Sequence, residues 1–418
     1  MFNNFRWISV IFSSIYDDIL LSTYLTTREF LSRHLTISEY DLYYSATIYS
    51  IGFLIGGLFW NILSKKYSVK KLLFISQFMV LVSTLGFFVS TSANQIFIIR
   101  FLQGLFANGA FICINILVRH NLKQGEFNKY LAMHTLFTYI AEAVMPLISG
   151  FLNKTFNFRA SIAFLVFIIL VSMYTAKLDL KDLNNKESFK SATKYTLKSY
   201  WYLMRSELCL LVIIAGIAEG VIDLLFNLLG GMIGKVSSGN SNQLLTLSLS
   251  IISVSSSILV NLISYLIPDK DEPDNNSNVK FNWLALKNGV NDQRILNFTI
   301  KTVIIILATN CVLNLSSNYI GLILYGITIA GGMCIINYMA TKMLYSVYYS
   351  AGCIASSLSF FETLCSALIQ GISLFATRLE ENRLIYLYCI VYLLIIWFLT
   401  KAFYRLIKSK YKSVSNSK

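Results

Sequence analysis

The chain has 418 residues, of which 56% are hydrophobic and 13% are charged, and these proportions exclude an ordinary soluble protein. Its formal net charge of +14 is typical of a membrane protein with basic internal loops, so it does not indicate a nucleic-acid partner. The seven cysteines lie in apolar stretches without paired spacing, which predicts buried thiols rather than disulfides or a metal site.

The long apolar runs predict an all-α integral membrane protein with twelve transmembrane helices in two six-helix bundles. A polar linker, residues 177–206, separates an N-terminal bundle, 1–176, from a C-terminal bundle with a cytoplasmic tail, 207–418. The spans are expected near residues 6–27, 43–63, 72–91, 95–118, 131–152, 158–176, 207–234, 243–267, 295–314, 318–341, 350–376 and 384–405.

The distribution of positive charge predicts the orientation of these spans. With the N-terminus inside, 26 Lys and Arg residues fall on the internal side and 7 on the external side. Such a bias favours a protein with both termini in the cytoplasm. Richness in Ile, Asn, Lys and Tyr indicates an AT-rich genome, so the expected location is a bacterial inner membrane.

One apolar stretch, residues 95–118, carries Arg100 inside it. A charge deep in a span costs ~2.5–3.5 kcal/mol on insertion scales, so it needs a partner or an aqueous cavity. The helical period places small and polar residues on one broad side of this span: Arg100, Gln103, Gly104, Ala107, Asn108 and Asn115. This pattern predicts that Arg100 lies in a transport pathway, with Gln103, Asn108 and Asn115 lining the cavity. The alternative is an arginine that merely pairs with a neighbouring helix.

Several short motifs occur in order along the chain. They are Arg100-Phe-Leu-Gln103-Gly104, Pro146-Leu-Ile-Ser149-Gly150, Phe158-Arg159-Ala-Ser-Ile-Ala-Phe164 and Ala351-Gly352-Cys-Ile-Ala355-Ser356-Ser357-Leu358. In that order they are similar to the family patterns R-x-x-Q-G, P-x-x-G-G (with Ser149 as a departure), W-R-x-x-F and A-G-T-A-S-S-L. Together they resemble the bicyclomycin/chloramphenicol-resistance branch of the drug:proton antiporters in the major facilitator superfamily. The resemblance implies alternating access between two bundles around a central site.

The loop after the second span also resembles this family but departs from its pattern. Residues 61–71 are similar to the family's G-x-L-S-D-R-x-G-R-R-K, with Lys65 in place of the acid and Asn61 and Ser68 in place of glycines. The resemblance implies a gating loop, whose basic residues here are Lys65, Lys66, Lys70 and Lys71. The missing acid indicates that the usual gating contact is absent or is supplied from elsewhere.

Asp17 and Asp18 lie deep in the first span, where the resemblance implies an acid within the family's D-x-Y-L-P run. A buried carboxyl group can take up and release a proton near neutral pH. The alternative is that either acid is a structural partner of Arg100. The sequence leaves open which of the two titrates.

Other polar residues inside the spans are also candidates. Glu219, Asp223 and Asn227 repeat every four residues, and two ionised acids at that spacing repel each other. They either line a cavity or make hydrogen bonds between helices. The remaining coupling or cavity candidates are Glu142, Glu362 and Gln370.

We therefore expect a proton-coupled secondary transporter that exports amphipathic small molecules or drugs. The alternatives are a metabolite carrier of the same fold, or a non-transporting receptor, which the altered loop favours and the retained intramembrane charges disfavour. No nucleophile–base pair, nucleotide-hydrolysing motif or metal pattern is visible, so neither an enzyme nor a cofactor is expected. The expected partners are a small-molecule substrate, protons or another cation, and the lipid bilayer. A monomer is compatible with the sequence.

Overall fold

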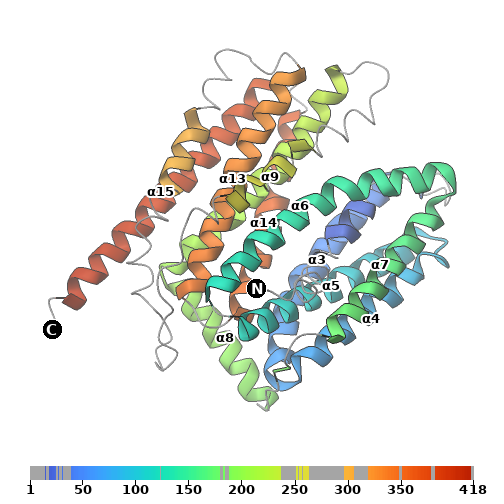
Figure 1. Cartoon of the computed structure of the whole chain (residues 1–418), viewed down its shortest axis with the longest axis horizontal. Helices are drawn as coiled ribbons and strands as arrows, with labels where there is room; N and C mark the ends of the chain where they lie inside the picture. Colours follow the sequence, from blue (N-terminus) through green and yellow to red (C-terminus); the bar gives the residue numbers. More distant parts are fainter. Residues whose placement is uncertain are drawn as a thin grey trace. The chain divides into compact units, whose positions relative to one another are not determined.

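The computed structural model describes most of the chain as α-helix. The described residues are 15, 18–24, 27, 31, 39–122, 124–178, 182–183, 188–236, 251–252, 254–256, 258–262, 296–305, 319–347, 351–377 and 382–415. The labelled helices (Figure 1) are α3 (Glu39–Lys66), α4 (Val69–Gly86), α5 (Ala93–Asn121), α6 (Gln124–Thr155), α7 (Phe158–Leu178), α8 (Phe189–Arg205), α9 (Leu208–Val236), α13 (Tyr319–Val347), α14 (Ala351–Thr377) and α15 (Asn382–Ser415).

The chain forms two compact units. The first comprises Met1–Leu197 together with Ser350–Phe360, and the second comprises Lys198–Tyr349 together with Phe361–Lys418. Helix α14 therefore begins with the first unit and continues in the second. The division into domains at 1–176, 177–206 and 207–418 stays a prediction.

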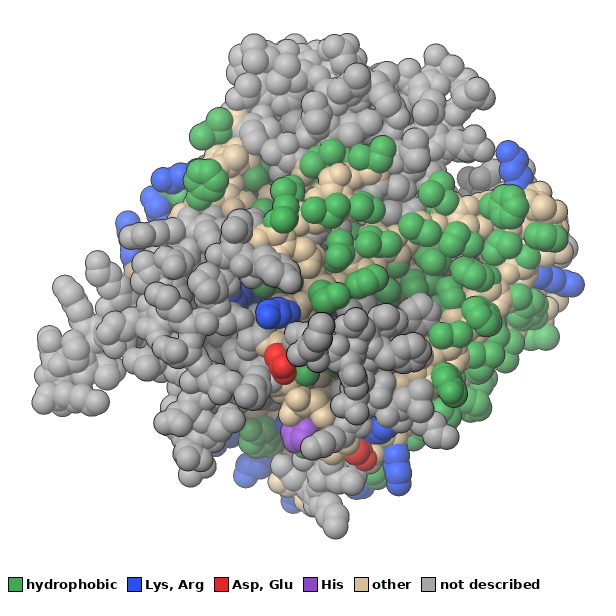
Figure 2. All heavy atoms as spheres, in the orientation of Figure 1, with side chains coloured by type: hydrophobic (Ala, Val, Ile, Leu, Met, Phe, Trp, Pro, Cys, Tyr) green, Lys and Arg blue, Asp and Glu red, His purple; other side chains and the backbone are tan. Residues whose placement is uncertain are grey.

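Six helices in the described part of the chain are long and apolar enough to cross a membrane. Their apolar cores are Ser45–Lys66, Val69–Phe88, Ala93–Asn121, Lys129–Thr155, Phe158–Thr175 and Gly352–Ile369. Each overlaps a span expected from the sequence. Their outward faces are apolar: α4 exposes Phe74, Phe78 and Val82, and α7 exposes Phe167 and Tyr174. Hydrophobic side chains gather over much of the described surface in Figure 2, as hydrocarbon contact requires.

Helix α4 starts and ends a few residues earlier than the expected span, 72–91. It starts at Val69 because the side chain of Ser68 accepts a hydrogen bond from the backbone N–H of Lys71, an N-cap. It ends at Gly86, where the chain tightens into turns in which Phe87 N–H bonds to the carbonyl of Thr84 and Phe88 N–H to that of Leu85. The apolar residues that follow extend the hydrophobic run but not the helix.

Helices α3 and α5 cross in close contact because glycines lie at their crossing. A Cβ added at Gly104 would collide with the backbone carbonyl of Tyr49, and one at Gly52 would collide with that of Phe101. Small residues at such positions let two membrane helices approach backbone to backbone. This approach places Tyr49 against the buried side of α5.

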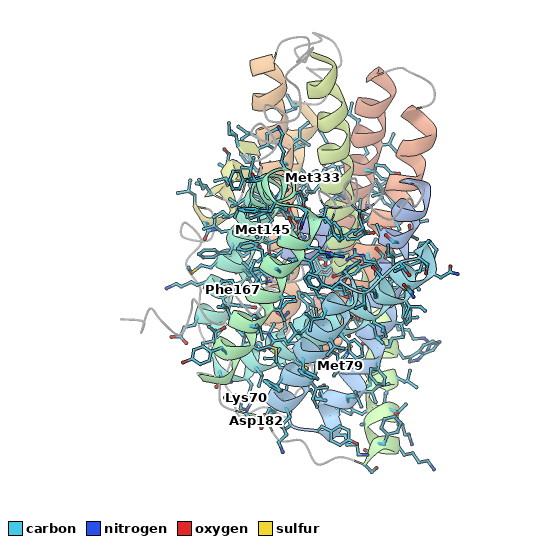
Figure 3. The ribbon with its side chains drawn as sticks, turned by 90° about the vertical axis from the view of Figure 1, so that its right-hand side faces the viewer. Lys70, Met79, Met145, Phe167, Asp182 and Met333 are labelled. Carbon is cyan, nitrogen blue, oxygen red and sulfur yellow. The ribbon has the colours of Figure 1, made fainter. Side chains whose placement is uncertain are left out.

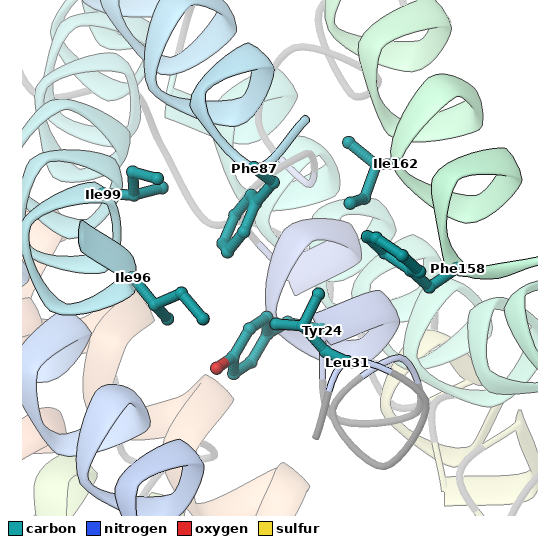
Figure 4. Packing of buried hydrophobic residues seen from close by; sticks show 7 residues of the cluster. All are labelled: Tyr24, Leu31, Phe87, Ile96, Ile99, Phe158 and Ile162. Atoms are coloured by element: carbon teal, nitrogen blue, oxygen red, sulfur yellow. The ribbon is translucent and has the colours of Figure 1, made fainter. Parts of the chain in front are cut away.

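A hydrophobic cluster packs the end of α4 against the starts of α5 and α7 in the first unit (Figure 4). Its residues are Tyr24, Leu31, Phe87, Ile96, Ile99, Phe158 and Ile162. The ring of Tyr24 packs against that of Phe87, with 5.9 Å between centroids. The cluster fixes the position of Tyr24, whose ring also contacts Arg100 on α5.

The predicted polar linker contains a helix, α8. Its buried residues are Ala192, Thr196, Ser199 and Leu203, which recur at three- and four-residue intervals and form one stripe. Lysines and exposed aromatic residues occupy the rest of its surface. The linker is therefore an amphipathic helix and not simply an extended polar connection.

Candidate functional site

Arg100 is the central charged residue of the first unit. Its side chain is 0% exposed, although it lies two turns inside the N-terminus of the apolar helix α5. The guanidinium carbon lies 4.0 Å from the centroid of the Tyr24 ring and 4.3 Å from that of Tyr49. Two stacked aromatic faces stabilise a desolvated cation by up to about 2 kcal/mol each, which offsets part of the cost of burying it.

A chain of hydrogen bonds leads from Arg100 to α4. Nη1 of Arg100 donates to Oε1 of Gln103 over 2.9 Å, and Nε2 of Gln103 donates to Oγ1 of Thr84 over 2.9 Å. The Thr84 hydroxyl donates in turn to the carbonyl of Val80 over 2.8 Å. Within the described part of the chain, the groups that contact the guanidinium are thus two aromatic rings and an amide, and not a carboxylate.

Two other donors of Arg100 lack an acceptor within the described part of the chain. Its Nε and Nη2 atoms are buried and find no acceptor among the described residues. Arg100 also lines a small cavity of about 10 Å³. Its other lining residues are Leu20, Tyr24, Thr27, Leu31, Phe87, Gln103, Ile162 and Leu165. Ligand sites of drug size occupy ~300–1,000 Å³. A large substrate would therefore reach Arg100 only after the surrounding helices move.

The first span contributes one described acid, Asp18, which is partly buried. Its Oδ2 atom accepts a hydrogen bond from the hydroxyl of Thr138 on α6 over 2.9 Å. Glu142, also partly buried, lies one turn further along α6, so it shares a face with Thr138. Asp17 lies outside the described residues.

The predicted cavity asparagines of α5 make contacts of two kinds. Asn115 is nearly buried and donates to the carbonyl of Phe111 on its own helix over 2.8 Å. Asn108 donates to the backbone carbonyl of Phe53 on α3, over 2.7 Å, and to the hydroxyl of Ser359 on α14. Asn108 thus joins three helices of the first unit, whereas Asn115 bonds within α5.

The Ala351–Leu358 run contacts the end of α3. Nδ2 of Asn61 donates to the Ser356 hydroxyl over 3.4 Å, and that hydroxyl donates to the carbonyl of Gly352 over 2.6 Å. A side chain at Gly352 would collide with Asn61 and with Ile116 of α5. The small residues of this run therefore allow α14 to pack closely on α3 and α5.

In the second unit, the structure brings Glu219 of α9 to an amide on α13. Nδ2 of Asn337 donates to Oε2 of Glu219 over 2.7 Å, and Thr341 donates to Oδ1 of Asn337 over 3.2 Å. Glu362 is partly buried on α14. The side chains of three further candidates lie outside the described residues: Asp223, Asn227 and Gln370.

The loop after α3 receives an acid from elsewhere in the chain. The Ser68 hydroxyl donates to Oδ2 of Asp182 over 2.6 Å, and the backbone N–H of Lys70 donates to Oδ1 over 3.1 Å. Lys70 and Asp182 lie side by side in Figure 3. Asp182 follows α7, so the linker places a carboxylate against a loop, residues 61–71, whose sequence contains no acid.

The lysines that end α3 contact aromatic residues of α8. Nζ of Lys65 lies 5.4 Å from the Tyr195 ring centroid, and Nζ of Lys66 lies 5.7 Å from that of Phe189. These cation–π contacts tie the predicted gating loop to the linker helix. Lys71 is exposed, and its backbone N–H donates a hydrogen bond to the side chain of Ser68.

Sequence reasoning did not find several partners in these sites. A lone Asn337 in the apolar stretch of α13 was a signal that could have been read, because isolated amides in membrane spans usually bond to another helix. Nothing in local spacing connects Tyr24 and Tyr49 with Arg100, or Asp182 with Ser68. Those pairs depend on how distant helices pack.

A set of helices long and apolar enough to cross a membrane, with a buried arginine and hydrogen-bonded acids inside them, is typical of a polytopic membrane transporter. The sequence model of the Major Facilitator Superfamily matches residues 7–369, so the chain belongs to this family of secondary transporters. Members of the family are transporters of small molecules and not enzymes. The resemblance noted in the sequence, and the all-helical membrane fold expected from it, are confirmed.

One curated relative is the bicyclomycin resistance protein homolog of Haemophilus influenzae (strain ATCC 51907 / DSM 11121 / KW20 / Rd). It is 25% identical over 140 residues, which are 33% of this chain and 34% of the relative. The match thus spans about one third of either protein. The relative's name is consistent with the branch predicted from the sequence motifs.

Solved structures match over nearly the whole chain. The human organic anion transporter MFSD10 (TETRAN) gives a TM-score of 0.70 at 12% identity, covering 96% of this chain and 100% of that one. The fucose:proton symporter FucP of E. coli gives 0.69 at 10% identity, covering 94% and 98%. The proton:xylose symporter XylE gives 0.67 at 12% identity, covering 97% of each chain. At such identities these likenesses establish the fold.

Proposed function

We propose that this transporter exports amphipathic small molecules in exchange for protons, and that Asp18 is the carboxyl group that carries the proton. The observation that carries the proposal is the hydrogen bond from the Thr138 hydroxyl to Asp18, which joins the first span to α6 inside the apolar region. A carboxyl group held there is costly when ionised and can be neutralised by a proton. Movement of α6 relative to the first span would change its surroundings and hence its proton affinity.

Observations other than the Thr138–Asp18 hydrogen bond also support the proposal. Asp18 falls at the acid that the family resemblance implies in the first span, and the curated relative is named for resistance to bicyclomycin. The aromatic pair around Arg100 and the hydrogen-bonded chain through Gln103 and Thr84 supply a fixed positive charge in the same unit. A fixed cation and an acid that can titrate within one bundle are compatible with proton-coupled alternating access.

The test measures the accumulation of bicyclomycin and of a panel of amphipathic antibiotics by inverted vesicles with an acid interior. Wild-type protein should accumulate one or more of these compounds when the proton gradient is imposed. Asp18→Asn should abolish accumulation but keep downhill exchange, because the amide preserves shape and cannot release a proton. Glu126→Gln, in the first turn of α6, is the matched control and should behave like wild type. Gradient-driven accumulation by Asp18→Asn would show that Asp18 is not the proton carrier. The same measurement on Asp17→Asn would then test whether Asp17 carries the proton.

A further inference from the structure

A basic groove lies in the second unit between the helical residues 296–305 and α15. It has a volume of about 380 Å³, and its lining residues are Asn297, Lys301, Trp397, Lys401, Tyr404 and Arg405. All six belong to the same compact unit. None of the candidate transport residues lies in it, so the groove is separate from the site described above.

Helical spacing aligns the lining residues along two facing stripes. Asn297 and Lys301 are one turn apart on one side of the groove. Trp397, Lys401 and Arg405 follow one another at four-residue steps on α15. The groove is therefore lined by side chains from successive turns of both helices.

The groove is strongly positive. Three of the six lining side chains are cations, none is a carboxylate, and Lys301, Lys401 and Arg405 are each exposed. Like charges placed around one slot repel each other, so a bound anion would stabilise the arrangement. Arg presents paired N–H donors that match a phosphate group, and Lys supplies further point charges.

The aromatic residues place this groove at the edge of an apolar surface. The ammonium of Lys401 lies 3.6 Å over the centroid of the Trp397 ring, and the Tyr404 hydroxyl contacts the sulfur of Met343. Leu394, about one turn before Trp397, and Phe398, directly after it, are exposed apolar residues, 45% and 68% respectively. Trp and Tyr next to Lys and Arg, beside an exposed apolar surface, mark the level of the lipid headgroups.

One donor among the groove residues has no acceptor in the described part of the chain. The indole Nε1–H of Trp397 is buried and finds no hydrogen-bond partner among the described residues. Buried donors are normally satisfied, and an indole N–H at the membrane boundary commonly bonds to a polar group there. A phosphate oxygen beside Lys401 would be such an acceptor.

We propose that this groove binds the phosphate headgroup of an anionic phospholipid, with Lys301, Lys401 and Arg405 around the phosphate and the acyl chains on the apolar surface of α15. Basic pockets between membrane helices have the charge and shape that suit such headgroups. The phosphate chemistry alone would also fit a free phosphate ion. The exposed apolar surface that continues from the groove favours the lipid, since a free ion would not contact it.

The test uses purified full-length protein and does not depend on transport. Native mass spectrometry in mild detergent measures the retention of phosphatidylglycerol against phosphatidylcholine. We expect selective retention of phosphatidylglycerol by wild-type protein. Lys401→Gln with Arg405→Gln should weaken it on the order of 25-fold, since each basic residue contributes about fivefold near an anionic headgroup. The control, Lys154→Gln with Arg159→Gln, changes two exposed cations of the other unit and should retain the lipid normally.

Two further measurements complete the test. One distinguishes a lipid phosphate from a soluble phosphate, and the other replaces the double variant if it does not fold. Inorganic phosphate and glycerol 3-phosphate are added at millimolar concentration, and neither should displace phosphatidylglycerol. Displacement by them would show a soluble phosphate site and overturn the lipid assignment. Should the double variant not fold, Lys301→Gln alone, at an exposed position, should reduce retention about fivefold. Equal retention of the two lipids by wild type, or equal losses in the groove and control variants, would overturn the proposal.

Discussion

Ser68 donates a hydrogen bond to Asp182 over 2.6 Å although 114 positions separate the two residues. The same carboxylate accepts from the backbone N–H of Lys70, so it sits at the N-terminus of α4, whose own first turn contains no acid. A negative charge there interacts favourably with the helix dipole and caps free N–H groups. In this way the linker supplies a negative group to a loop in which Lys65 occupies the position of the acid in the family pattern that the loop resembles.

The first prediction follows from this contact. Asp182→Ala and Ser68→Ala should each lower the stability of the purified protein by about 1 kcal/mol, because each removes part of the α4 cap. If the two residues act through one contact, the double variant should lose clearly less than the sum of the single losses. Thermal unfolding in detergent measures all three variants against wild type. Strictly additive losses would mean that the hydrogen bond does not couple them.

The second prediction compares two glycines. Gly104→Ala should lower folded yield and cost about 1–3 kcal/mol, because a Cβ there overlaps the backbone of Tyr49 and must push α3 away from α5. At Gly150, on α6, nothing lies within 4 Å of an added Cβ. Gly150→Ala should therefore be neutral or stabilise the helix by up to about 1 kcal/mol.

Size-exclusion profiles and unfolding temperatures of the two variants check this comparison. Both substitutions add one methyl group to a glycine inside a membrane helix, so they differ in the surroundings of the position and not in chemistry. Similar behaviour of the two variants would mean that the close crossing of α3 and α5 is not a constraint in the membrane.

The third prediction concerns orientation. The charge distribution predicts that the linker and the C-terminus are cytoplasmic and that the turn between α4 and α5 is external. In a cysteine-free background, Ser92→Cys should react with an impermeant maleimide in intact cells. Ser191→Cys and Ser417→Cys should react only in inverted vesicles. Ser92 and Ser191 are exposed in the structure, so lack of reaction reports sidedness and not burial. The reverse labelling pattern would contradict the predicted topology.

Apolar runs and helical periodicity were sufficient to predict the all-helical membrane fold and the broad positions of its helices. They also placed Arg100, Gln103 and Asn108 on the buried side of α5, where the structure has them. The position of a helix and the identity of its buried face are local properties, because they depend on the residues of that helix and on its immediate surroundings.

The partners of these residues could not be predicted in the same way. Tyr24 and Tyr49 reach Arg100 because glycines let α3 approach α5 and because a hydrophobic cluster positions the first span. Such contacts depend on packing between segments that are distant in the sequence. The helix α8 was missed for another reason: the linker is rich in lysine, and charge masked the stripe of small residues that includes Ala192 and Thr196.

The last prediction concerns Arg100 itself. Arg100→Ala should insert normally, because removing a buried charge favours the apolar span, but transport should fall to background. Arg100→Lys keeps the charge and loses the flat guanidinium that stacks on Tyr24 and Tyr49 and bonds to Gln103. Since stacking on each ring contributes about 0.5–2 kcal/mol, we expect transport by Arg100→Lys to be reduced on the order of tenfold.

Two additional variants separate a role in transport from simple packing. Tyr49→Phe keeps the aromatic face over the guanidinium and should transport nearly as well as wild type, whereas Tyr49→Leu fills similar space without an aromatic face and should resemble Arg100→Lys. Arg159→Ala removes an exposed arginine from the same unit and serves as the control. Uptake into vesicles is measured at matched amounts of inserted protein. Wild-type rates for Arg100→Ala would mean that the arginine is a packing residue, and the pathway would then have to be sought around Asp18 and Glu219.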